Sequence, residues 1–292
     1  MGLVWSLIFG TRYDINGASY KLVRQIGEGG FSYVYHVRNA RGEHFALKKL
    51  LIQLPEQRVA IDNEIMMCRQ LQHDNLIELV DHVITERSQS EALLLFPYYQ
   101  NGSLEDMISS RYGNQPQPME EQYIIRLFLS VSKAIQVMHT MTDPIAHRDI
   151  TPSNMMLDDQ QENLILTDLG SAAVATVTVS SRQEAIALQE ICAQTCTAPY
   201  RAPELFEIPS LPYMVTEVTD IWSLGCCLFY TVFGSCPFDG SALAAVSGRV
   251  PFPREHNYSE HLCDLIGQML SVESSQRPNI TQLINTFTQY TQ

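Results

Sequence analysis

The sequence predicts an α+β fold of two lobes, a small antiparallel sheet with one helix over a larger, mainly helical lobe. The chain has 292 residues, of which 45% are hydrophobic, so it can bury a full core. Strand-like runs are concentrated before residue 97, and helical spacing of apolar residues dominates after residue 102. The connector 97–101 between the two patterns is the predicted lobe boundary.

The net charge and the cysteines limit which partners, metal sites and cellular compartments fit this chain. The net charge of -13 argues against nucleic acid, because phosphate neutralisation needs a basic face; small molecules and proteins fit better. Seven cysteines without a C-x-x-C pair match neither a disulfide framework nor a zinc site and favour a reducing compartment. Cys192 and Cys196 have the spacing nearest to that of metal ligands, but we interpret them as ordinary helix residues.

The small lobe is predicted to begin with three strands, 21–27, 32–37 and 43–50, joined by turns at Gly29-Gly30 and at 39–42. Two further apolar runs, which complete the predicted sheet, cover residues 76–83 and 91–96.

A helix is predicted over 56–71, where Ile61, Ile65 and Cys68 recur at helical spacing. Glu64 shares their face. Because a buried carboxylate is costly unless a cation meets it, we expect Glu64 to have a basic partner.

The larger lobe contains two clear helical signals. Residues 119–141 carry apolar side chains at spacings of four, three, four and three, which predicts a long helix with one core face; they are Ile124, Phe128, Val131, Ile135 and Met138. Asp220 opens an apolar segment that runs to Tyr230, and we interpret Asp220 as the N-cap of a central helix.

A glycine-rich segment could surround a phosphate, since missing side chains let backbone N–H groups approach an anion. It contains Gly27, Glu28, Gly29, Gly30 and, after them, Val34. A strand-like stretch follows instead of a helix, which argues against a dinucleotide-binding fingerprint. A plain hairpin turn remains an alternative at this point.

The run Phe45-Ala46-Leu47-Lys48 alternates with a period of two. Ala46 and Lys48 therefore share one face of the strand, and Phe45 and Leu47 share the other. Lys48 is the natural partner for Glu64 and for nucleotide phosphates, although a lysine on a strand is more often simply solvated.

Three later motifs carry a resemblance to a known family. They are His147-Arg148-Asp149-Ile150-Thr151-Pro152-Ser153-Asn154, Leu166-Thr167-Asp168-Leu169-Gly170 and Tyr200-Arg201-Ala202-Pro203-Glu204. In this order, and together with the glycine segment and Lys48, they resemble the signature set of the protein kinases over about residues 20 to 290.

The resemblance implies ATP and Mg²⁺ as cofactors and gives each residue a role. Asp149 would accept the proton of the substrate hydroxyl, and Asn154 and Asp168 would hold Mg²⁺. Lys48, fixed by Glu64, would bind the α and β phosphates.

The same resemblance implies a nucleotide site in the small lobe and its connector. The Pro97 C=O and the Tyr99 N–H would bind adenine in front of Phe96. The other residues that it places against the nucleotide are Gly27, Glu28, Gly29, Gly30, Val34 and Ala46. It also pairs Arg277 with Glu204 in a structural contact.

Three positions depart from the usual kinase sequence, and a fourth bears on which hydroxyl is phosphorylated. Ser32 stands where the third glycine usually lies, and Leu169 replaces a phenylalanine; neither change removes a charge. Thr151 occupies the position of a lysine that neutralises the transferred phosphoryl group, which predicts slow catalysis. Thr197 matches the position that marks serine/threonine kinases, without excluding tyrosine as acceptor.

The resemblance identifies the stretch between Gly170 and Ala202 as the activation segment. A helix is predicted in it over 181–194, because Ala185, Leu188 and Cys192 follow a capping-box pattern at Ser181. With the glycine segment and the acylation signal described next, this resembles the Numb-associated kinases, specifically their myristoylated and palmitoylated serine/threonine kinase branch. A prefolded segment suggests constitutive activity, a hypothesis that loss of activity on phosphatase treatment would reject.

Residues 1–19 are predicted to be an acylated or apolar extension. The start satisfies the M-G-x-x-x-[ST] pattern for myristoylation of Gly2. No cysteine precedes Cys68 to carry a palmitoyl group, so Trp5 and its apolar neighbours would supply extra membrane contact. A terminal strand or tail packed on the small lobe is the alternative.

Together these features predict phosphorylation of protein serine and threonine, without excluding tyrosine, and autophosphorylation as well. The family resemblance places the chain in the cytoplasm, peripheral on the cytosolic face of Golgi or perinuclear membranes. The main alternative is a membrane-anchored pseudokinase scaffold, for which Thr151 is the best evidence. The identity of the protein substrates and the oligomeric state do not follow from the sequence.

Overall fold

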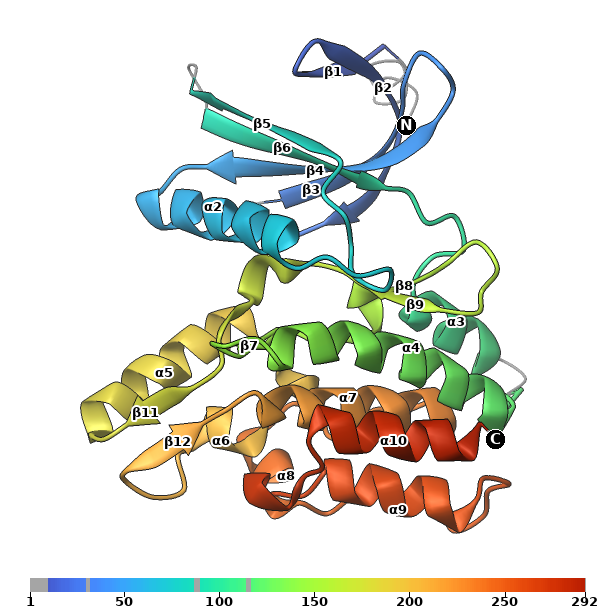
Figure 1. Ribbon diagram of the computed structural model, residues 1–292, viewed down its shortest axis with the longest axis vertical. Coiled ribbons are helices and arrows are strands. Elements are labelled where there is room, and N and C mark those ends of the chain that lie inside the picture. Colours follow the sequence, from blue (N-terminus) through green and yellow to red (C-terminus); the bar gives the residue numbers. More distant parts are fainter. Residues whose placement is uncertain (1–9, 30–31, 87–89, 114–116, 292) are drawn as a thin grey trace. The chain divides into compact units, whose positions relative to one another are not determined.

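The computed structural model describes residues 10–29, 32–86, 90–113 and 117–291. The chain divides into two compact units. The smaller unit comprises Met1–Gln72 and Ile77–Gln100, and the larger comprises His73–Leu76 and Asn101–Gln292 (Figure 1). The first is built on an antiparallel sheet and the second is mainly helical, as the sequence predicts. No helix in the described part of the chain is long and apolar enough to cross a bilayer.

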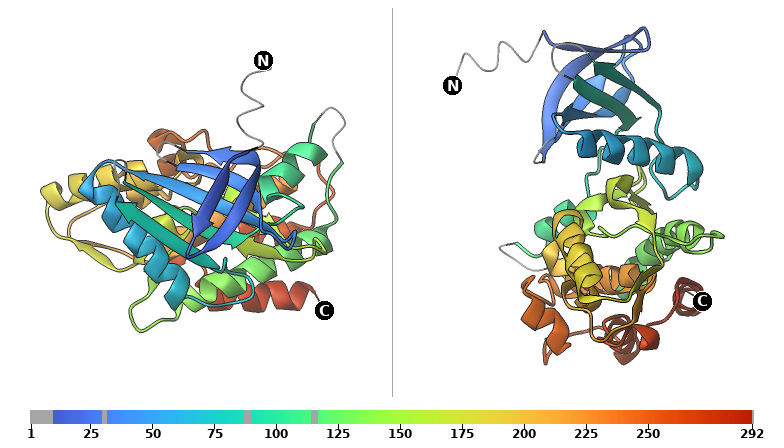
Figure 2. Two further views of the ribbon diagram at one scale, coloured as in Figure 1. Left: turned by 90° about the horizontal axis from the view of Figure 1, so that it is seen from above. Right: turned by 90° about the vertical axis from the view of Figure 1, so that its left-hand side faces the viewer.

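The smaller unit is a six-stranded sheet with the order β1-β2-β3-β4-β6-β5. Its strands are β1 (Arg12–Ile15), β2 (Ala18–Glu28), β3 (Ser32–Arg38), β4 (His44–Ile52), β5 (Asp81–Glu86) and β6 (Ser90–Pro97). All neighbouring strands are antiparallel. Helix α2 (Pro55–Gln70) lies across one face of this sheet (Figure 2).

Strand β1 and the turn that joins it to β2 lie within the segment predicted to be an extension. Its turn consists of Asn16 and Gly17, both with positive φ, 47° and 88°, as a two-residue type I′ turn requires. Ile15 is fully buried in a cluster with Tyr20 and Leu47. Part of the predicted extension therefore belongs to the sheet and its core.

The run 76–83 was predicted to form a strand of the small sheet, and this is wrong for its first half. The strand β5 begins only at Asp81. Leu76 instead forms a parallel bridge with Leu166 in the larger unit. An apolar run does not distinguish a strand from a buried connector, because both keep their side chains out of water.

The larger unit is organised around helices α4 (Glu121–His139) and α7 (Val218–Phe233), with α10 (Ile280–Tyr290) packed against α4 and α9 (Glu260–Met269) against α7 (Figure 1). The other helices are α3 (Leu104–Arg111), α5 (Arg182–Thr195), α6 (Pro203–Phe206) and α8 (Ala242–Ser247). Its strands are β7 (Ile145–Ala146), β8 (Met155–Leu157), β9 (Leu164–Leu166), β10 (Ala173–Val174), β11 (Val177–Val179) and β12 (Tyr213–Val215). Short 3₁₀ turns are η1 (Pro152–Asn154), η2 (Leu169–Ser171), η3 (Ala198–Tyr200) and η4 (Ser274–Gln276).

The predicted core face of α4 is confirmed, since all five of its expected apolar residues are fully buried. The prediction for α7 needs one correction. This helix begins at Val218, so Asp220 lies inside the first turn and is not the N-cap. Its carboxylate binds another segment, described below, and therefore does not serve the end of its own helix.

The helix predicted in the activation segment is also present, as α5. Ser181 is its N-cap and accepts a hydrogen bond from the Glu184 N–H, and Ala185, Leu188 and Cys192 are buried as expected. The Glu184 carboxylate accepts from the N–H of Ser180 at 2.7 Å, one residue before the position that a capping box would use.

Candidate active site

Lys48 and Glu64 meet inside the smaller unit. The Lys48 Nζ lies 2.7 Å from Glu64 Oε1, and Glu64 is 3% exposed. Lys48 reaches it from the sheet face opposite to the one on which Leu47 is buried. Strand β4 thus supplies Lys48 as the cationic partner that the buried Glu64 on α2 requires. The ion pair holds the Lys48 ammonium group on this face of the sheet.

The register of the sheet places the predicted nucleotide-binding positions close together on neighbouring strands. Gly27 of β2 is opposite Val34 of β3, and Val34 is opposite Lys48 of β4. Ala46 lies two residues from Lys48 on the same face and is opposite Phe96 of β6. An added Cβ on Gly27 would lie 3.4 Å from the Val34 side chain, an ordinary contact distance, so these two positions adjoin closely.

The rest of the glycine segment and the connector lie at the ends of these strands. Glu28 is the last residue of β2, and the Gly29 N–H donates to the Ser32 C=O at 2.8 Å. Gly30 lies outside the described residues. Pro97 ends β6 opposite Phe45, and Tyr99 follows it, partly buried.

Asp149 is held from two sides in the larger unit. The Asn154 Nδ2 donates to Asp149 Oδ2 at 3.1 Å and to its backbone C=O at 2.9 Å. The N–H of Thr197, in the activation segment, donates to Oδ1 at 2.9 Å. These bonds fix the orientation of a carboxylate that is only partly buried, which is what a base needs if it must meet a substrate hydroxyl.

His147 connects the loop 147–154 to the segment that precedes Asp168. Its Nδ1 accepts the Asp149 N–H at 3.3 Å, and its Nε2 donates to the Thr167 C=O at 3.0 Å. The ring is fully buried. Its role is therefore to position the backbone on both sides of the site.

Asp220 anchors the same loop from α7. It is fully buried, and its two oxygens accept the N–H groups of His147 at 2.7 Å and of Arg148 at 2.9 Å. Arg148 has a left-handed φ of 68°, a conformation that costs energy outside glycine, and these bonds stabilise it. Burial by itself raises the pKa of Asp220, but the His139 ring, His147 and the Arg148 N–H outweigh burial and lower it.

Asp168 and Asn154 are connected through Thr167. The Thr167 N–H and hydroxyl both donate to the Asn154 C=O, at 2.9 and 3.1 Å. Asp168 has a left-handed φ of 60°, and its Oδ1 accepts the Gly170 N–H at 3.4 Å. Leu169, the substitute for phenylalanine, is fully buried, so the change of side chain keeps an apolar anchor next to Asp168.

Thr151 is 5% exposed and directly precedes the turn η1. Its C=O accepts the Asn154 N–H at 3.0 Å. From Asp149 to Asn154 the chain reads Asp-Ile-Thr-Pro-Ser-Asn, so no cationic residue lies between these two positions.

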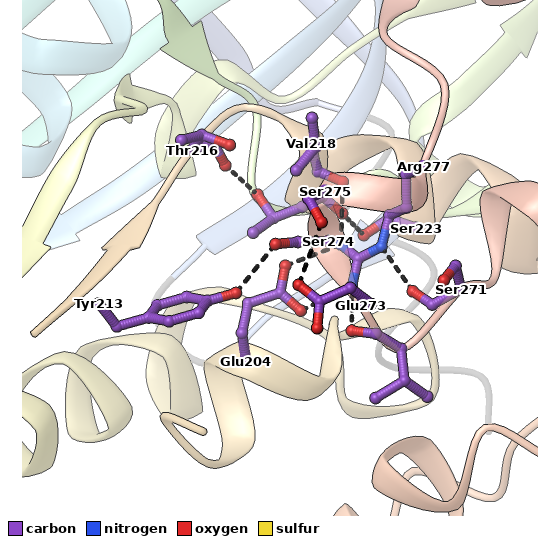
Figure 3. Close-up of polar contacts among 12 residues, drawn as sticks. Glu204, Tyr213, Thr216, Val218, Ser223, Ser271, Glu273, Ser274, Ser275 and Arg277 are labelled. Atoms are coloured by element: carbon purple, nitrogen blue, oxygen red, sulfur yellow. Dashed lines mark hydrogen bonds and ion pairs between the residues drawn. The ribbon is translucent and has the colours of Figure 1, made fainter. Parts of the chain in front are cut away.

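The predicted pair of Arg277 and Glu204 is confirmed. Two parallel bonds of 2.7 Å join the guanidinium to both carboxylate oxygens, and both side chains are almost fully buried (Figure 3). The Arg277 Nε also donates to the Ser271 C=O at 2.8 Å. The pair ties α6, at the end of the activation segment, to the loop before α10.

Sequence reasoning missed three contributors to this arrangement. Two of them are the anchoring of the loop by Asp220 and the hydrogen bond from the Thr197 N–H to Asp149. Both depend on contacts between distant segments, which no local sequence pattern predicts. The hairpin at Asn16-Gly17 had a signal, because Asn-Gly between alternating residues is typical of a two-residue turn.

Comparison with known proteins also identifies this chain as a protein kinase. The model of the protein kinase domain matches residues 20–287. Serine/threonine-protein kinase 16 of Mus musculus is 37% identical over 279 residues, which cover 93% of this chain and 90% of that protein. The Homo sapiens protein of the same name is 36% identical with the same coverage. A probable serine/threonine-protein kinase of Dictyostelium discoideum is 32% identical, and the match covers 96% of this chain and 96% of that protein. The chain therefore belongs to the protein kinase family.

Proposed function

We propose that this chain transfers the γ-phosphoryl group of ATP to serine and threonine hydroxyls of proteins, with autophosphorylation among its reactions. The observation that carries the proposal is the fixed Asp149 carboxylate, which is bound by Asn154 and by the Thr197 N–H. A general base has to be oriented before it can take a proton in the transition state.

The donor groups fit a nucleotide with magnesium. Because the Nδ2 of Asn154 makes the bonds to Asp149, its amide oxygen is the atom that remains for a metal ion. Asp168 adds carboxylate oxygens, and oxygen ligands are those that Mg²⁺ prefers. The bound Mg-ATP supplies the phosphoryl group and a metal that neutralises its charge. Lys48, held by Glu64, would place a positive charge against the phosphates.

We further propose that Lys48 and Glu64, from the smaller unit, bind the phosphates of ATP, and that Asp149, Asn154 and Asp168, from the larger, act on its γ-phosphoryl group and the metal. Gly27, Val34 and Ala46 would cover its base and phosphates, and the Pro97 C=O and Tyr99 N–H would bind the adenine edge. The test is phosphorylation of a protein mixture with Mg-ATP by the wild type and by the Asp149 variant described in the Discussion.

The second candidate function, a pseudokinase scaffold, has one specific observation in its favour. The catalytic loop lacks a cation where Thr151 stands, so one source of transition-state neutralisation is absent there. Nucleotide binding without any phosphoryl transfer, measured on the same preparation, would select the scaffold over the enzyme.

Thr151→Lys is expected to raise kcat about tenfold or more at saturating Mg-ATP and peptide, because it restores a charge beside the transferred group. Thr142→Lys, on an exposed loop of the same unit, is the matched control and should leave kcat unchanged. If Thr151→Lys folds with an unaltered melting temperature and kcat stays level or falls, Thr151 does not limit catalysis.

We also propose that the chain is a member of the myristoylated branch of the Numb-associated kinases and works at a cytosolic membrane surface of the Golgi or perinuclear region. The support is the acylation pattern at Gly2 and the apolar residues that follow, including Trp5; both positions lie outside the described residues. A single myristoyl chain binds membranes only marginally, so apolar contact from Trp5 would add to it.

Vesicle flotation after expression with N-myristoyltransferase checks this proposal. The wild type should float with the lipid, Gly2→Ala should remain mostly in the soluble fraction, and Trp5→Ser should fall between them, since it loses only apolar contact. Equal membrane fractions for the three proteins would remove the anchor from the proposal.

A further inference from the structure

Two cysteines lie one helical turn apart at the end of α5, in the activation segment. Cys192 is 0% and Cys196 5% exposed, and both are thiols. The Cys196 N–H donates to the Cys192 C=O at 3.0 Å. This bond keeps Cys196 within one turn of Cys192 although it follows the last helical residue, and a side-chain hydrogen bond joins the two thiols, so the two sulfur atoms are neighbours.

The surroundings make the two thiols unequal. A hydrogen bond with the Cys196 thiol, together with the charges of Arg148 and Arg201, lowers the pKa of Cys192 to about 7, against burial, which opposes this. The same hydrogen bond raises the pKa of Cys196. Arg201 is held in place by a 2.7 Å bond to the Cys196 C=O. The two thiols therefore share a proton, and the charges of Arg148 and Arg201 favour its loss from Cys192.

Four of the other cysteines have the opposite tendency, because burial raises the pKa of each; they are Cys226, Cys227, Cys236 and Cys263. Cys236 and Cys263 are nevertheless the more exposed thiols. Exposure alone would predict that Cys236 and Cys263 are oxidised first, whereas thiolate character predicts that Cys192 is oxidised first.

We propose that Cys192 and Cys196 are a modification site, at which a hydroperoxide converts the two thiols into an intramolecular disulfide. The Cys192 thiolate attacks one peroxide oxygen, the O–O bond breaks, and Cys192 becomes a sulfenic acid while the other oxygen leaves as water or alcohol after protonation. The Cys196 sulfur then attacks the Cys192 sulfur, the S–S bond forms, and the S–O bond breaks to release water. The peroxide is reduced and the two thiols are oxidised.

The end of the helix provides the freedom that the bond needs. Cβ atoms four residues apart in a helix are about 5–6 Å from each other, whereas a disulfide needs about 3.5–4.5 Å. The helix ends at Thr195, and Cys196 is already extended, with φ -116° and ψ 128°. The movement of Cys196 toward Cys192 would break one backbone hydrogen bond, that from the Cys196 N–H to the Cys192 C=O.

Peroxide can reach the two thiols through local opening of α5. This helix buries only three of its residues, Ala185, Leu188 and Cys192, and a segment with few buried contacts opens locally at a small cost in free energy.

Movement of Cys196 would reach the catalytic carboxylate. The next residue, Thr197, supplies the N–H that binds Asp149, and the preceding residue, Thr195, accepts the Ser171 hydroxyl through its C=O at 2.9 Å. We therefore expect the disulfide to loosen Asp149 and to reduce phosphoryl transfer reversibly. This consequence rests on the proposed function, whereas the formation of the disulfide does not.

Mass spectrometry after mild peroxide treatment tests the site. Trypsin cuts after Arg182 and Arg201, and the peptide 183–201 between them contains Cys192 and Cys196 and no other cysteine. After alkylation of the remaining thiols, this peptide should be unalkylated and lighter by two hydrogens at a peroxide dose that leaves Cys236 and Cys263 alkylated, and reduction should reverse the change. In Cys196→Ser, dimedone should label Cys192 instead.

Two further measurements complete the experiment. Iodoacetamide should modify Cys192 with a rate that rises through a pH of about 7, the pKa of this thiol, because the thiolate is the reactive form. Oxidised wild type should lose most of its phosphotransfer rate and regain it on reduction, while Cys192→Ser should be insensitive and Cys263→Ser should behave as wild type. Oxidation of Cys236 or Cys263 before this peptide, or sulfinic acid without a disulfide, would overturn the proposal, even in a protein that transfers no phosphate.

Discussion

Asp149→Asn is expected to lower kcat by about 10²–10⁴-fold, the usual contribution of a positioned general base. Asparagine retains an oxygen that can accept the Thr197 N–H, so the activation segment should keep its place while the proton acceptor is lost. Phosphopeptide formation under saturating Mg-ATP measures the rate, and the KM for ATP should change little because Asp149 is not among the expected nucleotide contacts.

The matched control is Asp264→Asn, the same chemical change at an exposed position of α9. It should leave the rate and the melting temperature unchanged. If Asp149→Asn retained the wild-type rate with a normal melting temperature, another group would have to be the base, and the proposed role of Asp149 would be wrong.

Arg277→Met is expected to lower the free energy of unfolding by about 3–5 kcal/mol, because it leaves the carboxylate of Glu204 buried without its partner. Urea unfolding followed by circular dichroism measures the loss. Arg254→Met is the control, since Arg254 is exposed and exposed charges contribute little.

The double variant Arg277→Met with Glu204→Leu separates the value of the pair from the cost of an unpaired charge. Removal of both charges should recover a large part of the lost stability, since apolar replacements of buried ion pairs are often close to neutral. If the double variant is as unstable as the sum of the single ones, the additional bonds of Arg277 to backbone carbonyls such as that of Ser271 carry the stability instead.

Local periodicity predicted much of the fold because it reports directly on which side chains leave water. The alternation around Lys48 and the helical spacing around Glu64 placed a cation and a buried carboxylate on facing surfaces, and the structure joins them at 2.7 Å. The spacing in α5 likewise predicted its three buried residues. In each case one strand or one helix contained the whole signal.

The departures occur where a side chain serves a distant segment. Asp220 has the sequence context of a helix cap, yet its oxygens bind the loop at His147 and Arg148, 73 and 72 residues away. Leu76, at the start of the apolar run 76–83, forms a bridge with Leu166 of its own unit and lies outside the strand β5. Neither outcome is encoded in neighbouring residues, because both depend on which surfaces meet after folding.

The sequence by itself determined the class of the fold, the family, and the identity of the groups proposed for catalysis, since these follow from residue types at fixed local spacings. Only the tertiary structure decided how Asp149 is oriented, which bonds hold Arg148 in a strained conformation, and that the charges of Arg148 and Arg201 act on the Cys192 thiol. Hydrogen bonds and charge interactions act over a few ångströms in space, whatever the separation along the chain, and folding alone brings those atoms within that range.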